Sequence, residues 1–130
     1  MIVDCVIIDD EPAAIEVLAG FADRTPNLSL LSSFRDPIQA LSFLRDNKVD
    51  LIFLDINMPE LNGMELLKVL IHPPLIIFTT AYTEYAIESY EKNAVDYLLK
   101  PVTFERFLIA VNKAQSRLMN KNPMVIDTSQ

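Results

Sequence analysis

The sequence predicts an α/β fold, a doubly wound three-layer sandwich in which helices cover both faces of a five-stranded parallel sheet. Short apolar runs rich in β-branched residues alternate five times with helical patterns along the 130 residues. The connections between them are only a few residues long, which favours parallel strands joined by right-handed crossovers. With 51% hydrophobic residues, the chain has enough apolar material for one compact domain.

Charge and cysteine content narrow the class of protein. The chain carries 18 acidic and 11 basic residues, a formal charge of −7, which disfavours attraction to nucleic acid or to an anionic membrane. A single cysteine, Cys5, can form no internal disulfide and suits a reducing compartment. The sequence shows neither a run of eighteen apolar residues nor a signal peptide. We therefore expect a cytoplasmic protein that makes no membrane contact.

The first third of the chain contains two strands and two helix starts. Residues 2–8 form a β-branched apolar run, and the helix that follows begins at Pro12, whose missing N–H costs nothing in the first turn. Apolar residues recur every three or four positions as far as Arg24, which predicts one face packed on a sheet. In residues 28–34 apolar residues are interspersed with serines, as expected for a more exposed strand near the edge of the sheet. Asp36 and the proline after it then provide a cap and a first turn for the second helix.

The central run, residues 51–54, contains four large apolar residues in succession and stops at Asp55. Such a run without alternation predicts a strand buried on both faces. A short helix over residues 63–70 and another buried strand over residues 75–81 follow it. Helix therefore continues to alternate with strand through the middle of the chain.

The last third has a polar helix over residues 84–92, a short strand over 94–99 and a helix over 103–120. This last helix has the clearest amphipathic pattern in the chain. Residues 121–130 lose the helical period and contain a proline. We expect a domain over residues 1–120 and a tail or the start of a linker over 121–130.

Four of the predicted strands end in residues with useful chemistry, and parallel strands bring those ends to one edge of the sheet. In chain order they are Asp9-Asp10, Asp55, Thr80 and Lys100-Pro101. Three neighbouring carboxylates repel one another, and a hard cation such as Mg²⁺ relieves that repulsion. Each residue has an ordinary explanation as a cap, a strand end or a turn, but together they suit phosphoryl transfer with Asp55 as nucleophile.

Because of these residues, the chain resembles the receiver domain of bacterial two-component response regulators. The resemblance extends from residue 2 to about residue 120. The resemblance implies the CheY-like, flavodoxin-like fold with strand order 2-1-3-4-5. It identifies Asp9 and Asp10 with the acidic pair of the family, Asp10 being the direct metal ligand. Asp55 matches the phosphoacceptor, and the backbone carbonyl of Asn57 matches the third contact to Mg²⁺.

The same resemblance extends to the residues that change conformation. Thr80, followed by alanine, matches the switch threonine, and Tyr97 matches the switch aromatic three residues before Lys100. We prefer Thr80 to Thr79 because adjacent strand residues face opposite sides. The Lys100-Pro101 pair matches the family's lysine and its usually cis proline bond.

The resemblance implies a signalling switch and not an enzyme acting on other substrates. A sensor histidine kinase would supply the phosphoryl group to Asp55, and self-phosphorylation and autodephosphorylation would be the only chemical steps. Thr80 and Tyr97 would relay the change to a dimerisation surface.

A narrower resemblance concerns residues 78–86 and 93–101, which are similar to receivers of the LytTR class. Full-length members of that class carry a C-terminal DNA-binding domain and control transcription. The chain stops where such a domain would begin, so it is either an excised receiver or a stand-alone receiver acting through protein contacts. In both cases this domain would not itself contact nucleic acid.

Two alternatives to a working receiver remain. A Mg²⁺-dependent phosphatase of the haloacid-dehalogenase type shares the aspartate, the metal and the lysine, but Asn57 stands where such enzymes place a general acid. Those enzymes also carry the nucleophile on the first strand. The other alternative is a receiver that is never phosphorylated, which the complete set of motif residues disfavours.

The charge pattern predicts where two copies of the domain would meet. Residues 84–92 are rich in acids, whereas the helix over 103–120 offers Arg106, Lys113 and Arg117 opposite its apolar face. We expect a phosphorylation-dependent homodimer through the helix over 84–92, the strand over 94–99 and the helix over 103–120. The alternative is that these charges only keep the helix pair soluble.

Overall fold

A computed structural model describes residues 1–82 and 93–120 as a five-stranded parallel sheet in the order β2-β1-β3-β4-β5. The strands are β1 (Val3–Ile8), β2 (Leu28–Phe34), β3 (Leu51–Asp55), β4 (Leu75–Thr80) and β5 (Ala94–Leu99). This order and the parallel pairing confirm the fold that the sequence predicts. Because every described pair is parallel, the carboxyl ends of all five strands lie along one edge of the sheet.

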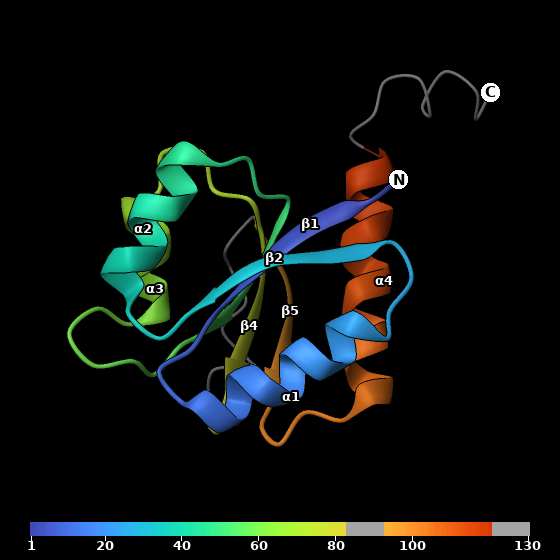
Figure 1. The fold of residues 1–130 in the computed structure, drawn as a ribbon, viewed down its shortest axis with the longest axis horizontal. Coiled ribbons are helices and arrows are strands. Elements are labelled where there is room, and N and C mark those ends of the chain that lie inside the picture. The colour runs from blue at the N-terminus through green and yellow to red at the C-terminus, as the bar shows by residue number, and fades with distance from the viewer. Residues whose placement is uncertain (83–92, 121–130) are drawn as a thin grey trace.

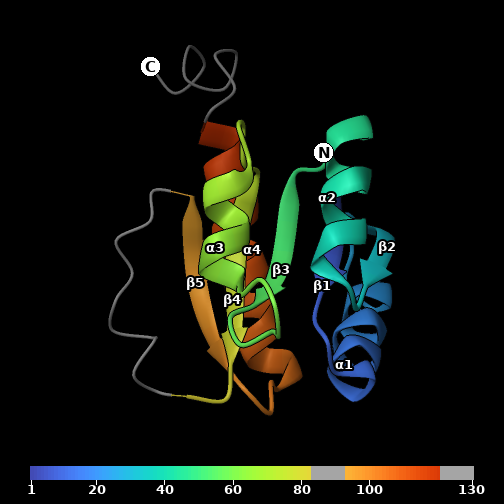
Figure 2. The same cartoon turned by 90° about the vertical axis from the view of Figure 1, so that its left-hand side faces the viewer.

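The helices form a layer on each face of the sheet (Figures 1 and 2). Helices α1 (Pro12–Asp23) and α4 (Phe104–Asn120) supply side chains to one apolar core, together with inward residues of the central strands. Helices α2 (Pro37–Asp46) and α3 (Gly63–Val69) supply the second core on the opposite face. The sheet is therefore the middle layer of the three-layer sandwich that the sequence predicts.

Strands β3 and β4 are buried along their whole length, as their unbroken apolar sequences predict. Successive side chains alternate between the two cores, with Phe53 in the α1/α4 core and Leu54 in the α2/α3 core. The Phe53 ring stacks on Phe107 of α4, with the ring centroids 5.0 Å apart. Each such fully buried side chain stabilises the fold by about 1.5–3 kcal/mol. These two strands are the rigid base from which Asp55 and Thr80 project.

Capping residues fix where the helices begin. The Asp36 side chain accepts a hydrogen bond of 2.9 Å from the backbone N–H of Ile38, which confirms its predicted role at the start of α2. Asn62 and Glu65 form a reciprocal capping box at the start of α3. Helix α4 begins at Phe104, one residue later than expected, because the Thr103 hydroxyl accepts from the backbone N–H of Arg106 as a cap.

The remaining predictions fall partly outside the described residues. The helix expected over 84–92 and the tail expected over 121–130 lie in segments that the structure does not describe. Among the described residues, strand β2 lies at the edge of the sheet and is only partly buried, as its serines predict. Within residues 1–82 and 93–120, none of the helices has the length and apolar character needed to span a membrane.

Candidate functional site

The strand register places the predicted site residues side by side at the carboxyl edge of the sheet. Ile8 pairs with Leu54, so the residues that follow them, Asp9 and Asp55, project from neighbouring strands. Lys100 follows the last residue of β5, and its backbone N–H donates a hydrogen bond of 2.7 Å to the Thr80 carbonyl. The cis peptide bond between Lys100 and Pro101 agrees with the resemblance. Residues far apart in the sequence thus meet as expected.

The Lys100 ammonium lies at the centre of this pocket. Its Nζ atom is 2.9 Å from Asp9 Oδ2, 2.7 Å from Glu11 Oε1 and 3.5 Å from Asp55 Oδ1. Asp9 and Asp55 are almost completely buried, at 1% and 3% exposure, whereas the Glu11 side chain is largely exposed. One lysine therefore faces three carboxylates, two of them removed from water.

The excess of acid over base alters the protonation of the buried groups. Burial and the negative charge of Asp9 raise the pKa of Asp55 from 3.8 to about 7, although Lys100 acts in the opposite direction. Burial alone would lower the pKa of Lys100, but its hydrogen bonds to Glu11 and Asp9 raise that pKa above its ordinary value. The lysine therefore stays charged, while the ionised form of Asp55 is disfavoured.

The pocket offers oxygen donors suited to a hard divalent cation. Carboxylate oxygens of Asp9, Glu11 and Asp55 lie within 4.8 Å of one another. Asp10 is not in that set, but its Oδ1 atom is buried without a hydrogen-bond partner among the described residues. Apart from the Lys100 ammonium, Asp9 Oδ2 also lacks a partner there. Buried oxygens left in this state fit a bound cation, since they would otherwise be costly.

Glu11 was not singled out from the sequence, although the structure places it against Lys100. It occupies the N-cap position of α1 but makes no capping hydrogen bond with its side chain. Glutamate is a poor choice for that position, where Asp, Asn, Ser and Thr are preferred. This mismatch is the signal that the sequence carried, because it indicates a side chain with another partner.

The loop after β3 folds back tightly on Asp55. The backbone N–H of Asn57 donates to Asp55 Oδ1 at 3.3 Å, and the N–H of Gly63 donates to the Ile56 carbonyl at 2.9 Å. A Cβ atom at Gly63 would collide with the carbonyl oxygen of Asp55, so only glycine allows this close approach. Asn57 is exposed, and its hydrogen bond to Asp55 keeps its backbone beside the pocket.

Thr80 and Thr79 have different surroundings. The Thr80 hydroxyl donates to Asn57 Oδ1 at 3.4 Å and accepts from the backbone N–H of Tyr82 at 3.0 Å. Thr79 Oγ1 is buried and has no hydrogen-bond partner in the described residues. The structure thus directs Thr80, the predicted switch residue, toward the loop after Asp55. Tyr97 is buried and stacks on Phe78, with the ring centroids 5.1 Å apart.

A second charged cluster lies on β5 and α4. Arg106 contacts both oxygens of Asp96 at 2.7 and 2.8 Å, and Lys113 Nζ lies 3.1 Å from Asp96 Oδ2. Burial would raise the pKa of Asp96, but hydrogen bonds from Arg106 and Lys113 hold it below its ordinary value. Two of the three basic residues expected to face a second copy are therefore bound within their own chain.

Comparison with known proteins identifies relatives over most of the chain. The family described as the response regulator receiver domain matches residues 5–112. An uncharacterized response regulatory protein of Vibrio vulnificus is 40% identical over 109 residues, which are 82% of this chain and 45% of that protein. The transcriptional regulatory protein YpdB of Escherichia coli is 36% identical over 114 residues, 85% of this chain and 47% of YpdB.

A solved structure shows the same fold. The crystal structure of the response regulatory domain of MrkE from Klebsiella pneumoniae has a TM-score of 0.77 and 37% identity, and the match covers 88% of this chain and 96% of that one. The chain spans about half the length of the curated relatives that it matches.

Proposed function

Because the chain belongs to the receiver domain family of two-component response regulators, we propose that Asp55 accepts a phosphoryl group from a sensor histidine kinase. The observation that carries this proposal is the position of Lys100 Nζ, 2.9 Å from Asp9 and 3.5 Å from Asp55. A lysine held there can neutralise charge on a group that is transferred to Asp55. Glu11 gives Lys100 a largely exposed partner at 2.7 Å, which the ammonium can exchange for a phosphoryl oxygen.

The proposed transfer is a displacement at phosphorus. An oxygen of ionised Asp55 forms the new O–P bond as the N–P bond of the kinase phosphohistidine breaks, and the imidazole nitrogen keeps the electron pair. Mg²⁺, held by Asp9, Asp10, Asp55 and the backbone carbonyl of Asn57, would neutralise the charge that accumulates. A neighbouring cation also favours the ionised form of Asp55, whose pKa is raised to about 7 without one.

Intact-mass spectrometry after incubation with acetyl phosphate and Mg²⁺ tests this proposal. The wild-type chain should gain one phosphoryl group, whereas Asp55→Asn should gain none. Excess EDTA should abolish the gain in wild type. An adduct that persists in EDTA, or that peptide analysis assigns to a serine, threonine or histidine, would contradict the proposal.

The two members of the acidic pair should contribute unequally to metal binding. Asp9 Oδ2 is engaged by Lys100, while Asp10 Oδ1 has no hydrogen-bond partner in the described residues and is free to bind a cation. We therefore expect Asp10→Ala to weaken Mg²⁺ binding more than Asp9→Ala in a calorimetric titration. Equal losses in the two variants would show this assignment to be wrong.

Signalling should be separable from phosphate uptake. We propose that Thr80 moves to hydrogen-bond the phosphoryl group, and that this movement changes the packing of Tyr97. Thr80→Ala should then still be phosphorylated but should lose the phosphorylation-dependent shifts in NMR spectra over residues 93–100. The same shifts in Thr80→Ala and in wild type would contradict a switch role for Thr80.

We propose that residues 1–120 are the receiver of a cytoplasmic LytTR-class regulator of transcription, with residues 121–130 leading toward its DNA-binding domain. Two observations support this: the chain spans about half of its curated relatives, and one of them is named a transcriptional regulatory protein. A stand-alone receiver acting through protein contacts is the alternative. Sequencing the full gene distinguishes them, since only the first predicts a further domain.

Phosphorylation is also proposed to tighten a homodimer through residues 84–92, β5 and α4. Arg106, Lys113 and Arg117 are the basic residues expected on this face, and Arg106 and Lys113 also pair with Asp96 within their own chain. Exposed ion pairs contribute only about 0.2–1 kcal/mol each, which predicts weak association before activation. Sedimentation with beryllofluoride should show a rise in mass that Arg117→Glu reduces. An unchanged mass would place the regulated surface elsewhere.

A further inference from the structure

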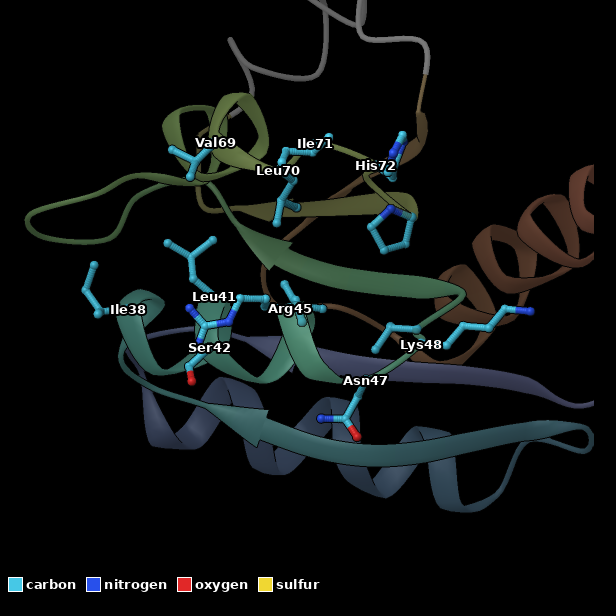
Figure 3. A pocket seen from close by; sticks show the side chains of 13 residues that line it. Ile38, Leu41, Ser42, Arg45, Asn47, Lys48, Val69, Leu70, Ile71 and His72 are labelled. Carbon is cyan, nitrogen blue, oxygen red and sulfur yellow. The ribbon is translucent and has the colours of Figure 1, made fainter.

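A groove lies between helix α2 and the segment that ends α3 and leads into β4, and none of the residues of the Lys100 pocket lines it (Figure 3). Its cavity volume of about 660 Å³ is within the usual size of ligand-binding clefts. Leu41, Leu44, Val49 and Leu70 are among its apolar lining residues. Figure 3 shows Val69, Leu70 and Ile71 opposite Ile38 and Leu41 across the opening.

Three large apolar side chains around this groove are exposed to solvent. Ile38 is 56% exposed, Val69 is 55% exposed and Ile71 is 87% exposed. Single exposed apolar residues need no explanation, but several gathered around one concave surface indicate a binding site. Exposure also means that these residues contribute little to the stability of the fold.

The charges that line the groove all have one sign. Its charged lining residues are Arg45 and Lys48, His72 lies beside them, and no acid among the described residues lines the groove. This is unusual in a chain with a formal charge of −7. Arg45 forms an ion pair with its neighbour Asp46, at 3.6 Å between two exposed side chains, and Lys48 and His72 have no ion-pair partner among the described residues.

We propose that this groove binds an amphipathic helix of a partner protein that combines an apolar face with acidic residues. Helices dock by placing apolar side chains in such grooves, and the basic lining would pair with the acids at their margin. A second copy of this chain fits less well, because a two-fold axis would bring the same basic residues together. Lys48 and His72 lie where β3 and β4 begin, whereas Asp55 and Lys100 lie where strands end. Docking and phosphoryl transfer can therefore occur together.

Two synthetic helical peptides test this proposal by NMR titration of the isotope-labelled chain. They share one leucine face and differ only in carrying glutamate or lysine at the remaining positions. The glutamate peptide should shift the amide signals of residues 38–49 and 69–74, and the lysine peptide should bind about tenfold more weakly or worse. Equal binding of the two peptides, or shifts that map to another surface, would overturn the proposal.

Variants of exposed residues identify the site without endangering the fold. Ile71→Asp should abolish binding of the glutamate peptide, and Lys48→Glu should remove the preference for it over the lysine peptide. Val17→Asp is the matched control, because Val17 is 45% exposed on α1, on the opposite face of the sheet, and should bind as wild type does. Unimpaired binding by Ile71→Asp would overturn the proposal. So would sedimentation showing that a second copy already fills the groove.

Discussion

Two charged clusters, one around Lys100 just after β5 and one around Asp96 within β5, have opposite compositions. Around Lys100, one base faces Asp9, Glu11 and Asp55, and the pKa of Asp55 is raised to about 7. Around Asp96, one acid is held by Arg106 and Lys113, and its pKa is lowered. Each cluster contains a carboxylate that lies on a strand and is largely buried. Burial alone therefore does not explain why the pKa is raised in one cluster and lowered in the other.

The ratio of acids to bases explains it. In the Asp96 cluster, Arg106 and Lys113 neutralise the carboxylate. The cluster can therefore hold β5 against α4, and a further cation would not stabilise it. The Lys100 pocket leaves carboxylates without compensation, and such a pocket stores unfavourable energy that a metal ion relieves. A strongly shifted pKa in a pocket of this kind marks a candidate site of chemistry. The predictions below compare the two clusters, from the largest expected effect to the smallest.

Loss of the lysine should cost far more in the first cluster than in the second. Lys100→Met leaves Asp9 and Asp55 buried without a cation, which we expect to lower the free energy of unfolding by about 2–4 kcal/mol. Lys113→Met should lower it by less than about 1 kcal/mol, because Lys113 is half exposed and Arg106 remains on Asp96. Urea denaturation at neutral pH in EDTA measures both. Equal losses would contradict the comparison.

Removal of the negative charge at Asp55 should stabilise the metal-free domain at high pH. The pKa of Asp55 is higher in the folded chain than its ordinary 3.8, so ionisation opposes folding as pH rises toward about 7. We expect Asp55→Asn to raise the free energy of unfolding by about 1–3 kcal/mol at pH 8. The gain should vanish below about pH 3, where the wild-type carboxyl is protonated in both the folded and the unfolded state. A gain independent of pH would point to packing instead of charge.

The corresponding change in the second cluster should have the opposite sign. Asp96→Asn removes the charge that holds Arg106, and we expect a loss of about 1–2 kcal/mol at neutral pH, discounted because both partner bases are partly exposed. Since the pKa of Asp96 is lowered in the folded chain, its contribution is present at neutral pH and lost in acid. Thermal unfolding at pH 7 and at pH 3 tests this. Stabilisation by Asp96→Asn would contradict it.

Glu11 should matter least to stability. Its side chain is 63% exposed, so its contact with Lys100 is well screened by water even though it lowers the pKa of Glu11. We expect Glu11→Gln to change the free energy of unfolding by no more than about 0.5 kcal/mol. Chemical denaturation beside the exposed control Glu16→Gln measures this. A loss as large as that of Lys100→Met would mean that Glu11 is part of the buried charge network.

The sequence predicted the fold well because its strongest signals depend only on local patterns and on parallel topology. Unbroken apolar runs identified β3 and β4, and serine alternation placed β2 at the edge. Parallel pairing then brought Asp9, Asp55 and Lys100 together without any knowledge of side-chain geometry. Strand ends can be assigned from sequence because the backbone alone determines where they lie.

The sequence did not reveal contacts that depend on where long side chains point. Glu11 reaches Lys100 instead of capping α1, and Arg106 turns inward to Asp96 instead of facing solvent. Both outcomes follow from rotamers and competition among nearby charges, which residue order does not specify. The groove beside Ile71 was missed for a related reason, since its walls come from segments whose spacing depends on how α2 and α3 pack.

Titration of the two carboxyl groups in one sample tests the comparison most directly. The side-chain carbon signals of Asp55 and Asp96 can be followed by NMR as pH changes, first in EDTA and then with Mg²⁺. We predict that in EDTA Asp55 titrates with a pKa far above that of Asp96, near 7, and that Mg²⁺ lowers the pKa of Asp55 while leaving Asp96 unchanged. Ordinary and equal pKa values for the two groups in EDTA would contradict an acid-rich pocket that requires a cation.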